Sequence, residues 1–136
     1  MIYLASPWFD EEAKSFCEEV EEFIISESLD AYFPRRNQFD SALETFYSNV
    51  NEINKCDVLV ALILRKDVGT AWEKGMAYSK NIPIILVGKD ESTFKSKTNL
   101  MLAMCGTCMT FDNFKKYLTD GKLFNIIKFD NWEGIE

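Results

Sequence analysis

The sequence predicts an α/β fold, in which a doubly wound sheet of about five mainly parallel strands carries helices on both faces. Two apolar runs, at 58–64 and 82–87, have the length and β-branched content of strands that are covered on both sides. Segments with helical spacing of apolar residues alternate with such runs along the chain. This alternation is typical of parallel sheets with right-handed crossovers, so we expect a single domain over residues 1–136.

Each expected element rests on its apolar spacing and on the residues that start or stop it. Pro34 ends a short strand, Pro83 lies at the start of another, and Gly88 ends that one. Asp10 and Thr70 precede helical segments and are expected to cap them. The expected elements are, in order, a strand at 2–5, a helix after residue 10, a strand at about 29–33, a helix at about 41–55, a strand at 58–64, a helix at 70–80, a strand at 82–87, a short helix at 99–104, a strand at 108–111, a helix at 112–118 and a terminal extended segment at 123–129.

The chain is acidic and has no stretch suited to a membrane. Its formal net charge is −7, so it offers no basic stripe that could follow a polyphosphate backbone. No apolar run approaches the roughly 18 residues of a membrane span. We therefore expect neither nucleic acid nor a membrane as a partner, and we expect a cytoplasmic protein that acts on small molecules.

The chain contains no histidine, which excludes Ser-His-Asp and Cys-His nucleophile systems and histidine bases. Acid and base roles then fall to carboxylates, tyrosines or lysines. Of the four cysteines, only Cys105 and Cys108 form a C-x-x-C pair, and no second pair of ligands accompanies them. We therefore expect no metal and no cofactor, and we interpret the cysteines as buried free thiols.

The segment 67–78 is the strongest candidate for the chemistry. Asp67 follows a predicted buried strand, at the sheet edge where parallel α/β proteins bind ligands. Gly69 permits a sharp loop and Thr70 is the expected helix cap, which places Glu73 in the first helical turn. Two carboxylates would then face one crevice. The alternative interpretation is that a first-turn carboxylate is an ordinary surface group favoured by the helix dipole.

Other polar residues stand at the ends of expected strands. Asp57 immediately precedes the strand at 58–64, where it either caps the connection or serves the function. Residues 35–38, Arg-Arg-Asn-Gln, supply polar donors after the strand at about 29–33. Both groups are candidates for contacts with a substrate.

Two longer motifs and four short ones lie in order along the chain. The longer ones are Tyr-Leu-Ala-Ser-Pro-Trp-Phe at 3–9 and Asp-x-Gly-x-x-x-Glu-x-Gly-x-Ala at 67–77. The short ones are Tyr-x-Pro-x-x-Asn-Gln at 32–38, Cys-Asp-Val at 56–58, Thr-Asn-Leu-Met at 98–101 and Phe-Asp-x-x-Glu-Gly at 129–134. Over nearly its whole length the chain thus resembles the nucleoside 2-deoxyribosyltransferase family. The resemblance implies a flavodoxin-like fold and transfer of 2-deoxyribose between nucleobases through a covalent sugar ester, with 2'-deoxynucleosides and free nucleobases as substrates.

The resemblance also implies roles for individual residues. By position, Glu73 is the nucleophile that attacks the anomeric carbon, Tyr3 orients the carboxylate of Glu73, and Asp57 exchanges a proton with the departing base. It further implies a homo-oligomer with shared active sites, based on dimers or built up to a hexamer. The implied substrate-binding residues are Asp67 at the sugar hydroxyls, Trp8, Phe9 and Gln38 at the base, Gly69, and Asn99 and Met101 from a neighbouring subunit.

The residues also suit this chemistry without the family. Glycosyl transfer through an oxocarbenium-like transition state needs one carboxylate as nucleophile and a second acid or base. Two alternatives stay open. The Arg35-Arg36 pair departs from the family pattern and suits a 5'-phosphate, as in related hydrolases that cleave nucleoside 5'-monophosphates with water. The other alternative is a nucleotide-binding module without turnover.

Overall fold

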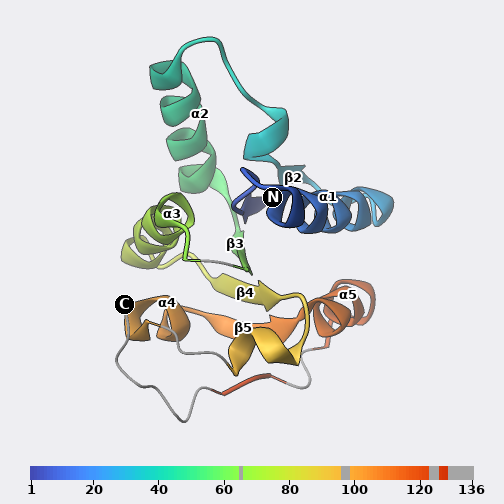
Figure 1. Ribbon diagram of the computed structural model, residues 1–136. Helices are drawn as coiled ribbons and strands as arrows, with labels where there is room; N and C mark the ends of the chain where they lie inside the picture. The colour runs from blue at the N-terminus through green and yellow to red at the C-terminus, as the bar shows by residue number, and fades with distance from the viewer. Residues whose placement is uncertain (65, 96–98, 123–125, 129–136) are drawn as a thin grey trace.

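The computed structural model describes residues 1–64, 66–95, 99–122 and 126–128. Five parallel strands form one sheet in the order β2-β1-β3-β4-β5, with helices on both faces (Figure 1). This order is the flavodoxin-like one, and it confirms the predicted doubly wound α/β fold. The strands are β1 (Ile2–Ala5), β2 (Ala31–Tyr32), β3 (Val58–Ile63), β4 (Ile84–Gly88) and β5 (Thr107–Thr110), and the helices are α1 (Glu11–Ser26), α2 (Ala42–Lys55), α3 (Val68–Ser79), α4 (Leu100–Met104) and α5 (Phe111–Asp120), with short 3-10 turns η1 (Pro34–Arg36) and η2 (Glu91–Phe94).

The sheet separates two apolar cores. On one face, alternate strand residues such as Leu4 and Val60 pack against α1 and α5. On the other face, Tyr3 and Leu59 pack with residues of α2 and α3. Since the central strands are buried on both faces, their sequences are almost continuously apolar, which is why the runs were recognisable.

The start of α3 differs from the expectation. Asp67, and not Thr70, is the N-cap, because its Oδ2 accepts hydrogen bonds from the backbone nitrogen and the hydroxyl of Thr70, at 2.7 Å each. The helix therefore begins at Val68. As a consequence, Gly69 is helical and forms no sharp loop, and Glu73 lies in the second turn instead of the first.

The remaining boundaries shift by a few residues. The edge strand β2 has only two residues, and α5 starts at Phe111, capped by Thr110, where the sequence predicted the end of a strand. Gly88 is the last residue of β4, and a Cβ there would lie 2.6 Å from the ring of Phe94. The polar segment 89–98 contains η2, capped by Asp90, and its residues 96–98 lie outside the described residues.

The terminal extended segment expected at 123–129 lies only partly within the described residues. Of residues 126–128, Ile127 forms an antiparallel bridge with Cys108, and its backbone nitrogen donates to the Cys108 carbonyl at 2.9 Å. The motif noted at 129–134 lies outside the described residues. Among the helices that are described, none has the length and apolar character needed to cross a bilayer.

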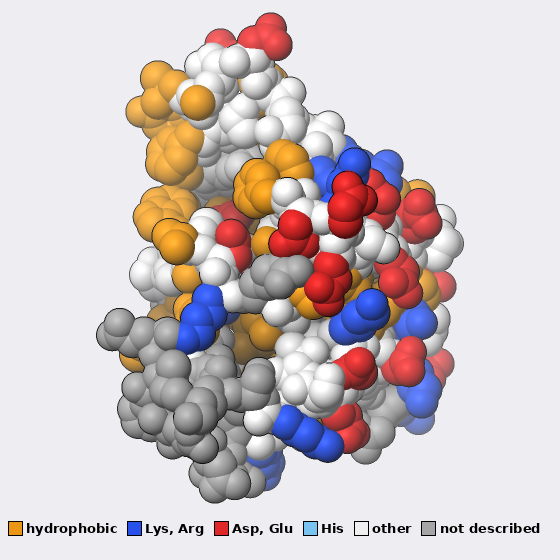
Figure 2. All heavy atoms as spheres, in the orientation of Figure 1, with side chains coloured by type: hydrophobic (Ala, Val, Ile, Leu, Met, Phe, Trp, Pro, Cys, Tyr) orange, Lys and Arg blue, Asp and Glu red, His pale blue; other side chains and the backbone are white. Residues whose placement is uncertain are grey.

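The helical spacing of the apolar residues in α2 predicts one apolar stripe, but most of this stripe does not belong to the core. Its members are Leu43, Phe46, Tyr47, Val50 and Ile53. Ile53 is buried, whereas Leu43, Phe46 and Tyr47 are 62, 47 and 56% exposed. Figure 2 shows apolar side chains gathered along the flank that α2 and α3 form. The helical period is correct, but three of the five stripe residues face outward, on a helix that packs beside α3 (Figure 1).

Candidate functional site

Tyr3 and Glu73 meet on the face of the sheet that α2 and α3 cover. Tyr3 is the second residue of β1 and is fully buried, and its hydroxyl donates a hydrogen bond to Oε2 of Glu73. Glu73 lies in α3, which packs on this face through Ala77. The fold therefore brings together two residues that the sequence singled out, although they are 70 positions apart.

The environment of Glu73 favours the neutral form of its carboxyl group. Burial raises the pKa of Glu73 to about 7, the hydrogen bond from Tyr3 opposes this rise, and the negative charge of Asp67 adds to it. The helix dipole would help to keep a first-turn Glu73 ionised, as the sequence predicts, but the structure places Glu73 in the second turn, beyond the reach of the dipole. Burial, and then the charge of Glu73, raise the pKa of Tyr3, so its hydroxyl stays protonated and acts as a donor.

Asp67 serves the architecture of this site as well as its electrostatics. Its Oδ2 is occupied by the two hydrogen bonds to Thr70 that cap α3. The same carboxylate is close enough to raise the pKa of Glu73. Both predicted carboxylates are thus brought to one region, at the start of α3.

A cavity of about 360 Å³ opens between α2 and α3 beside Glu73. Its wall is mostly apolar, with the polar side chains of Glu73 and Asn49 and the indole N–H of Trp72 among its lining. The lining residues are Phe46, Asn49, Val50, Ile53, Val68, Gly69, Trp72 and Glu73. A mainly apolar cavity with a few convergent polar groups is typical of a small-molecule site.

Asn49 is a polar residue of this cavity that the sequence analysis did not predict, as it did not predict the apolar lining residues. A signal was present, since Asn49 stands three residues after Phe46 and four before Ile53, and so lies on the face of α2 that was predicted to be apolar. A polar residue in such a stripe is a candidate for a buried or functional contact. The prediction of the stripe rested on its apolar members alone, so it gave Asn49 no role.

Tyr32 connects Asn49 to the Tyr3–Glu73 pair. Its ring stacks on that of Tyr3, with ring centroids 5.7 Å apart and an interplanar angle of 21°. Its hydroxyl donates to Oδ1 of Asn49 at 3.2 Å and lies 2.8 Å from Oγ of Ser48. Strand β2 thus supports both polar groups of the cavity wall.

Asp57 does not join this group. It precedes β3, and its backbone nitrogen donates to the carbonyl of Met1 at 2.9 Å, which places it at the amino ends of the central strands. Its side chain is 83% exposed and pairs with the amino group of Met1. Asp57 is absent from the residues that line the cavity beside Glu73. Of the two interpretations of Asp57, the structure favours the one in which it belongs to the connection between elements.

The residues expected at the base lie in two loops, one after β1 and one after η1. Trp8 and Phe9 stack on each other with centroids 4.5 Å apart, but Trp8 packs against the α1 core and Phe9 is 78% exposed. Gln38 is exposed and donates to the carbonyl of Pro34 at 2.9 Å. None of the three lines the cavity between α2 and α3.

The cysteines behave as the sequence analysis expected of thiols. All four are free, and three of them are buried, whereas Cys105 is half-buried. Burial raises the pKa of Cys108 to about 12 and also raises that of Cys105. Within the part of the chain that the structure describes, no three carboxylate or cysteine side chains gather in a way that could hold a metal ion.

Comparison with known proteins identifies the family. The profile of the family described as nucleoside 2-deoxyribosyltransferase matches residues 2–119. The chain belongs to the nucleoside 2-deoxyribosyltransferase family. No curated protein sequence matches the chain.

Several solved structures share the fold. A 2-deoxyribosyltransferase from the psychrotolerant bacterium Bacillus psychrosaccharolyticus is 25% identical, with a TM-score of 0.72 over 86% of this chain and 89% of that one. A 2-deoxyribosyltransferase from Leishmania mexicana is 19% identical, with a TM-score of 0.66 over 89% and 98%. A CMP N-glycosidase from Clostridium botulinum is 20% identical, with a TM-score of 0.61 over 87% and 93%. The last two comparisons bear on the fold alone.

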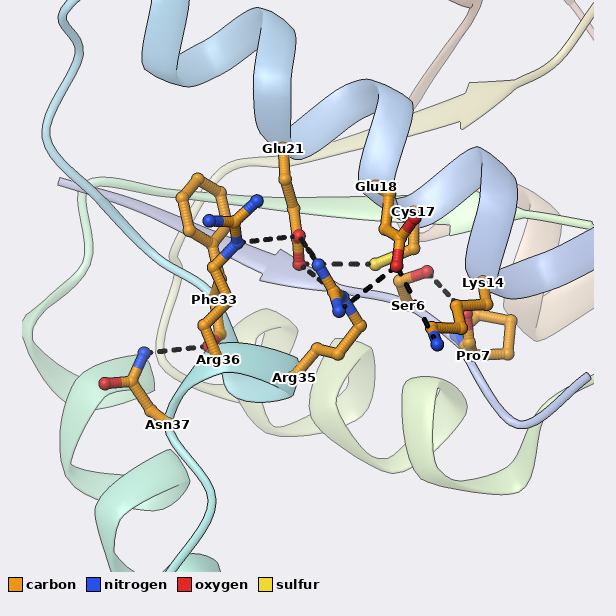
Figure 3. A network of polar contacts seen from close by, with 10 residues as sticks. All are labelled: Ser6, Pro7, Lys14, Cys17, Glu18, Glu21, Phe33, Arg35, Arg36 and Asn37. Atoms are coloured by element: carbon orange, nitrogen blue, oxygen red, sulfur yellow. Dashed lines mark hydrogen bonds and ion pairs between the residues drawn. The ribbon is translucent and has the colours of Figure 1, made fainter. Parts of the chain in front are cut away.

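The arginine pair that set this chain apart from the deoxyribosyltransferase pattern is already engaged within the protein (Figure 3). Arg35 donates to Glu21 through Nη2 at 2.6 Å and pairs with Glu18 at 3.3 Å, and Arg36 donates to Glu21 through Nε at 2.9 Å. The side chain of Glu21 is only 1% exposed. These cations therefore tie η1 to α1, and neither lines the cavity beside Glu73. The suggestion that they bind a 5'-phosphate loses its structural basis.

Asn99 and Met101, which the resemblance assigns to a neighbouring subunit's site, stand at the start of α4. Oδ1 of Asn99 accepts from the backbone nitrogens of Met101 and Leu102, so Asn99 caps this short helix. Met101 is 74% exposed. Neither residue lines the cavity of its own chain.

Proposed function

We propose that the protein is a nucleoside 2-deoxyribosyltransferase with Glu73 as its nucleophile. The observation that supports this best is the hydrogen bond from the buried hydroxyl of Tyr3 to Glu73 at the wall of a cavity. The hydroxyl holds the carboxylate in one orientation, and poor solvation leaves the ionised form reactive. A pKa of about 7 provides a substantial ionised fraction at neutral pH.

The proposed reaction has two displacement steps. In the first, an oxygen of Glu73 bonds to C1' of a 2'-deoxynucleoside, the bond from C1' to the base nitrogen breaks, and its electron pair goes to the base. In the second, a nitrogen of another base attacks C1', the bond from C1' to the Glu73 oxygen breaks with its electron pair returning to the carboxylate, and the incoming base loses one N–H proton to water, as the departed base gains one. Each step inverts the anomeric carbon, so the product keeps the β configuration. Neither step changes an oxidation state.

Other residues are proposed to bind the substrate. Asp67, beside Glu73, would hold the sugar hydroxyls, with Gly69 in the adjoining wall of the cavity. Trp8, Phe9 and Gln38 would contact the base from the loops after β1 and η1. Asp57 is left out of the proposed mechanism, because its exposed carboxylate lies at the amino ends of the strands.

We further propose that the chain self-associates through the exposed apolar side chains of α2, α3 and α4, which we call the apolar flank. Figure 2 shows the part of it along α2 and α3. A large group of exposed apolar side chains, such as the apolar flank, is typical of an interaction surface. It adjoins the cavity through Phe46, Val68 and Trp72, so a second copy could complete the site with Asn99 and Met101. The exposed members of the apolar flank are Leu43, Phe46, Tyr47, Val68, Trp72, Tyr78, Leu100, Met101 and Met104.

A base-exchange assay tests the proposed function. The protein is incubated with a 2'-deoxynucleoside, with and without a second free base, and the products are separated by chromatography. A new nucleoside supports the transferase. Free deoxyribose without a new nucleoside points to a hydrolase instead, and no product at all points to a binding module.

Mass spectrometry tests the proposed nucleophile. With a 2'-deoxynucleoside and no acceptor base, a deoxyribosyl adduct is expected on the peptide that contains Glu73. An adduct on Asp67 or Asp57 would overturn the assignment. A ribonucleoside is expected to react far more slowly, because its electron-withdrawing 2'-hydroxyl disfavours an oxocarbenium-like transition state.

A further inference from the structure

The orientation of the Asn49 side chain is set by a residue outside the cavity. The hydroxyl of Tyr32, on β2, donates to Oδ1 of Asn49 at 3.2 Å and lies 2.8 Å from the hydroxyl of Ser48 on the same helix. The Tyr32 ring is in turn held by stacking on Tyr3. A rigid strand residue thus contacts the amide of Asn49 at a defined atom.

This contact decides which chemical group Asn49 offers to a ligand. A carboxamide has one acceptor atom and one donor group, on opposite sides of its terminal carbon. With Oδ1 directed at Tyr32, the NH2 group is turned away from Tyr32, and Asn49 lines the cavity. The cavity would then present an acceptor, the Glu73 carboxylate, and an oriented amide donor, that of Asn49, in a wall whose other residues are apolar, glycine or Trp72, which carries an indole N–H.

We infer that Tyr32 is a positioning residue, and that through it Asn49 donates a hydrogen bond to an acceptor of the nucleobase next to the glycosidic nitrogen. This inference rests on the proposed function. The acceptor would be N3 of a purine or the 2-carbonyl oxygen of a pyrimidine, the atoms of a base that lie close to the anomeric carbon attacked by Glu73.

The same contact would act on the departing base. When the bond from C1' to the base nitrogen breaks, its electron pair spreads over the acceptor atom, and a hydrogen bond from the Asn49 amide stabilises that charge. An amide does not release a proton at neutral pH, so the base takes its proton from water after it departs. Asn49 therefore acts as a donor of a hydrogen bond and not as a general acid.

A purely structural role for Tyr32 predicts something else. On that view, its hydroxyl only ties β2 to α2, and its loss weakens every ligand to the same degree. A positioning role predicts a loss that depends on the acceptor atom of the ligand. The two roles are separated by pairing a variant of the protein with a variant of the ligand.

The experiment measures binding by calorimetry in a Glu73→Ala background, so that no turnover occurs. The ligands are two matched pairs, 2'-deoxyadenosine with its 3-deaza analogue and thymidine with its 2-thio analogue. For whichever parent nucleoside binds, Tyr32→Phe is expected to lower the affinity about 5-fold to 10-fold, the value of one hydrogen bond. The affinity for the matching analogue is expected to change by less than about 2-fold. Ser48→Ala, the matched control, is expected to leave both ligands within about 2-fold.

Asn49→Ala completes the set. It is expected to bind parent and analogue alike, and Tyr32→Phe added to it is expected to have no further effect. Equal weakening of parent and analogue by Tyr32→Phe, or no weakening, overturns the inference and leaves the proposed function intact. If Glu73→Ala binds no nucleoside and the wild type exchanges no base, the proposed function and this inference fail together.

Discussion

Replacing Glu73 by glutamine should abolish base exchange and, at the same time, make the protein more stable above neutral pH. Glutamine keeps the shape of the side chain and can still accept the hydrogen bond from Tyr3, but it carries no charge. Loss of the nucleophile should lower the exchange rate at least about a thousandfold. The gain in stability follows from the raised pKa of Glu73.

The size and sign of that gain can be worked out. The pKa of Glu73 rises from 4.5 to about 7, which corresponds to roughly 3 kcal/mol between the two protonation states. Below pH 4.5 both the folded and the unfolded chain hold the proton, and the residue contributes nothing. As pH rises to about 7, only the unfolded chain releases it freely, so the folded wild type is progressively destabilised. Above that pH the free energy of unfolding of the wild type is lowered by the full amount.

Urea denaturation at several pH values measures this difference. Wild type and Glu73→Gln should have similar free energies of unfolding near pH 4.5, and the variant should be more stable by roughly 3 kcal/mol at pH 8. Asp57→Asn, which changes an exposed carboxylate outside the cavity, is the control and should show no such growing gain. A difference between Glu73→Gln and wild type that stays constant from pH 4.5 to 8 would refute the reasoning about burial.

Four further changes test other parts of the site. Tyr3→Phe removes a hydrogen bond that lowers the pKa of Glu73, so the rise of exchange rate with pH should move to higher pH. Asp67→Asn keeps a capping side chain but removes a charge that raises the same pKa, so a pH-rate profile should move the opposite way. Glu21→Gln leaves its two arginine partners without the buried charge, so the free energy of unfolding measured by urea denaturation should fall by about 3 kcal/mol. Loss of a surface ion pair would lower it by under about 1 kcal/mol. Tyr47→Glu places a charge on the apolar flank, so the variant should sediment more slowly than the wild type and have little exchange activity. A wild-type protein that is monomeric and active would contradict the proposal of shared active sites.

The architecture was predictable from the sequence because burial on both faces leaves a plain signal. The runs at 58–64 and 82–87 have no alternation of polar and apolar residues, and that pattern indicates a covered parallel strand. The period of α2 was also clear. What the period could not show is which side of that helix would be covered, since this depends on where α2 stands relative to the sheet.

Local hydrogen bonds explain the errors near the site. Aspartate and threonine both cap helices well, and the sequence alone does not say which of Asp67 and Thr70 is used. The structure uses the aspartate because its carboxylate accepts from both the backbone and the hydroxyl of Thr70. Because the cap is Asp67, Glu73 lies beyond the first turn, where the helix dipole has little effect. Burial then has the largest effect on the pKa of Glu73.

By itself, the sequence determined that acid and base chemistry must use carboxylates, tyrosines or lysines, because it has no histidine. It also singled out Glu73 by its position and Tyr3 through the family resemblance. Only the tertiary structure decided what surrounds them. In the structure, the arginine pair binds Glu21, Asp57 lies at the amino ends of the strands, and Asn49 of α2 lines the cavity. These outcomes depend on contacts between different segments of the chain. Local spacing can mark a residue such as Asn49 as unusual, but it does not specify which segment that residue meets.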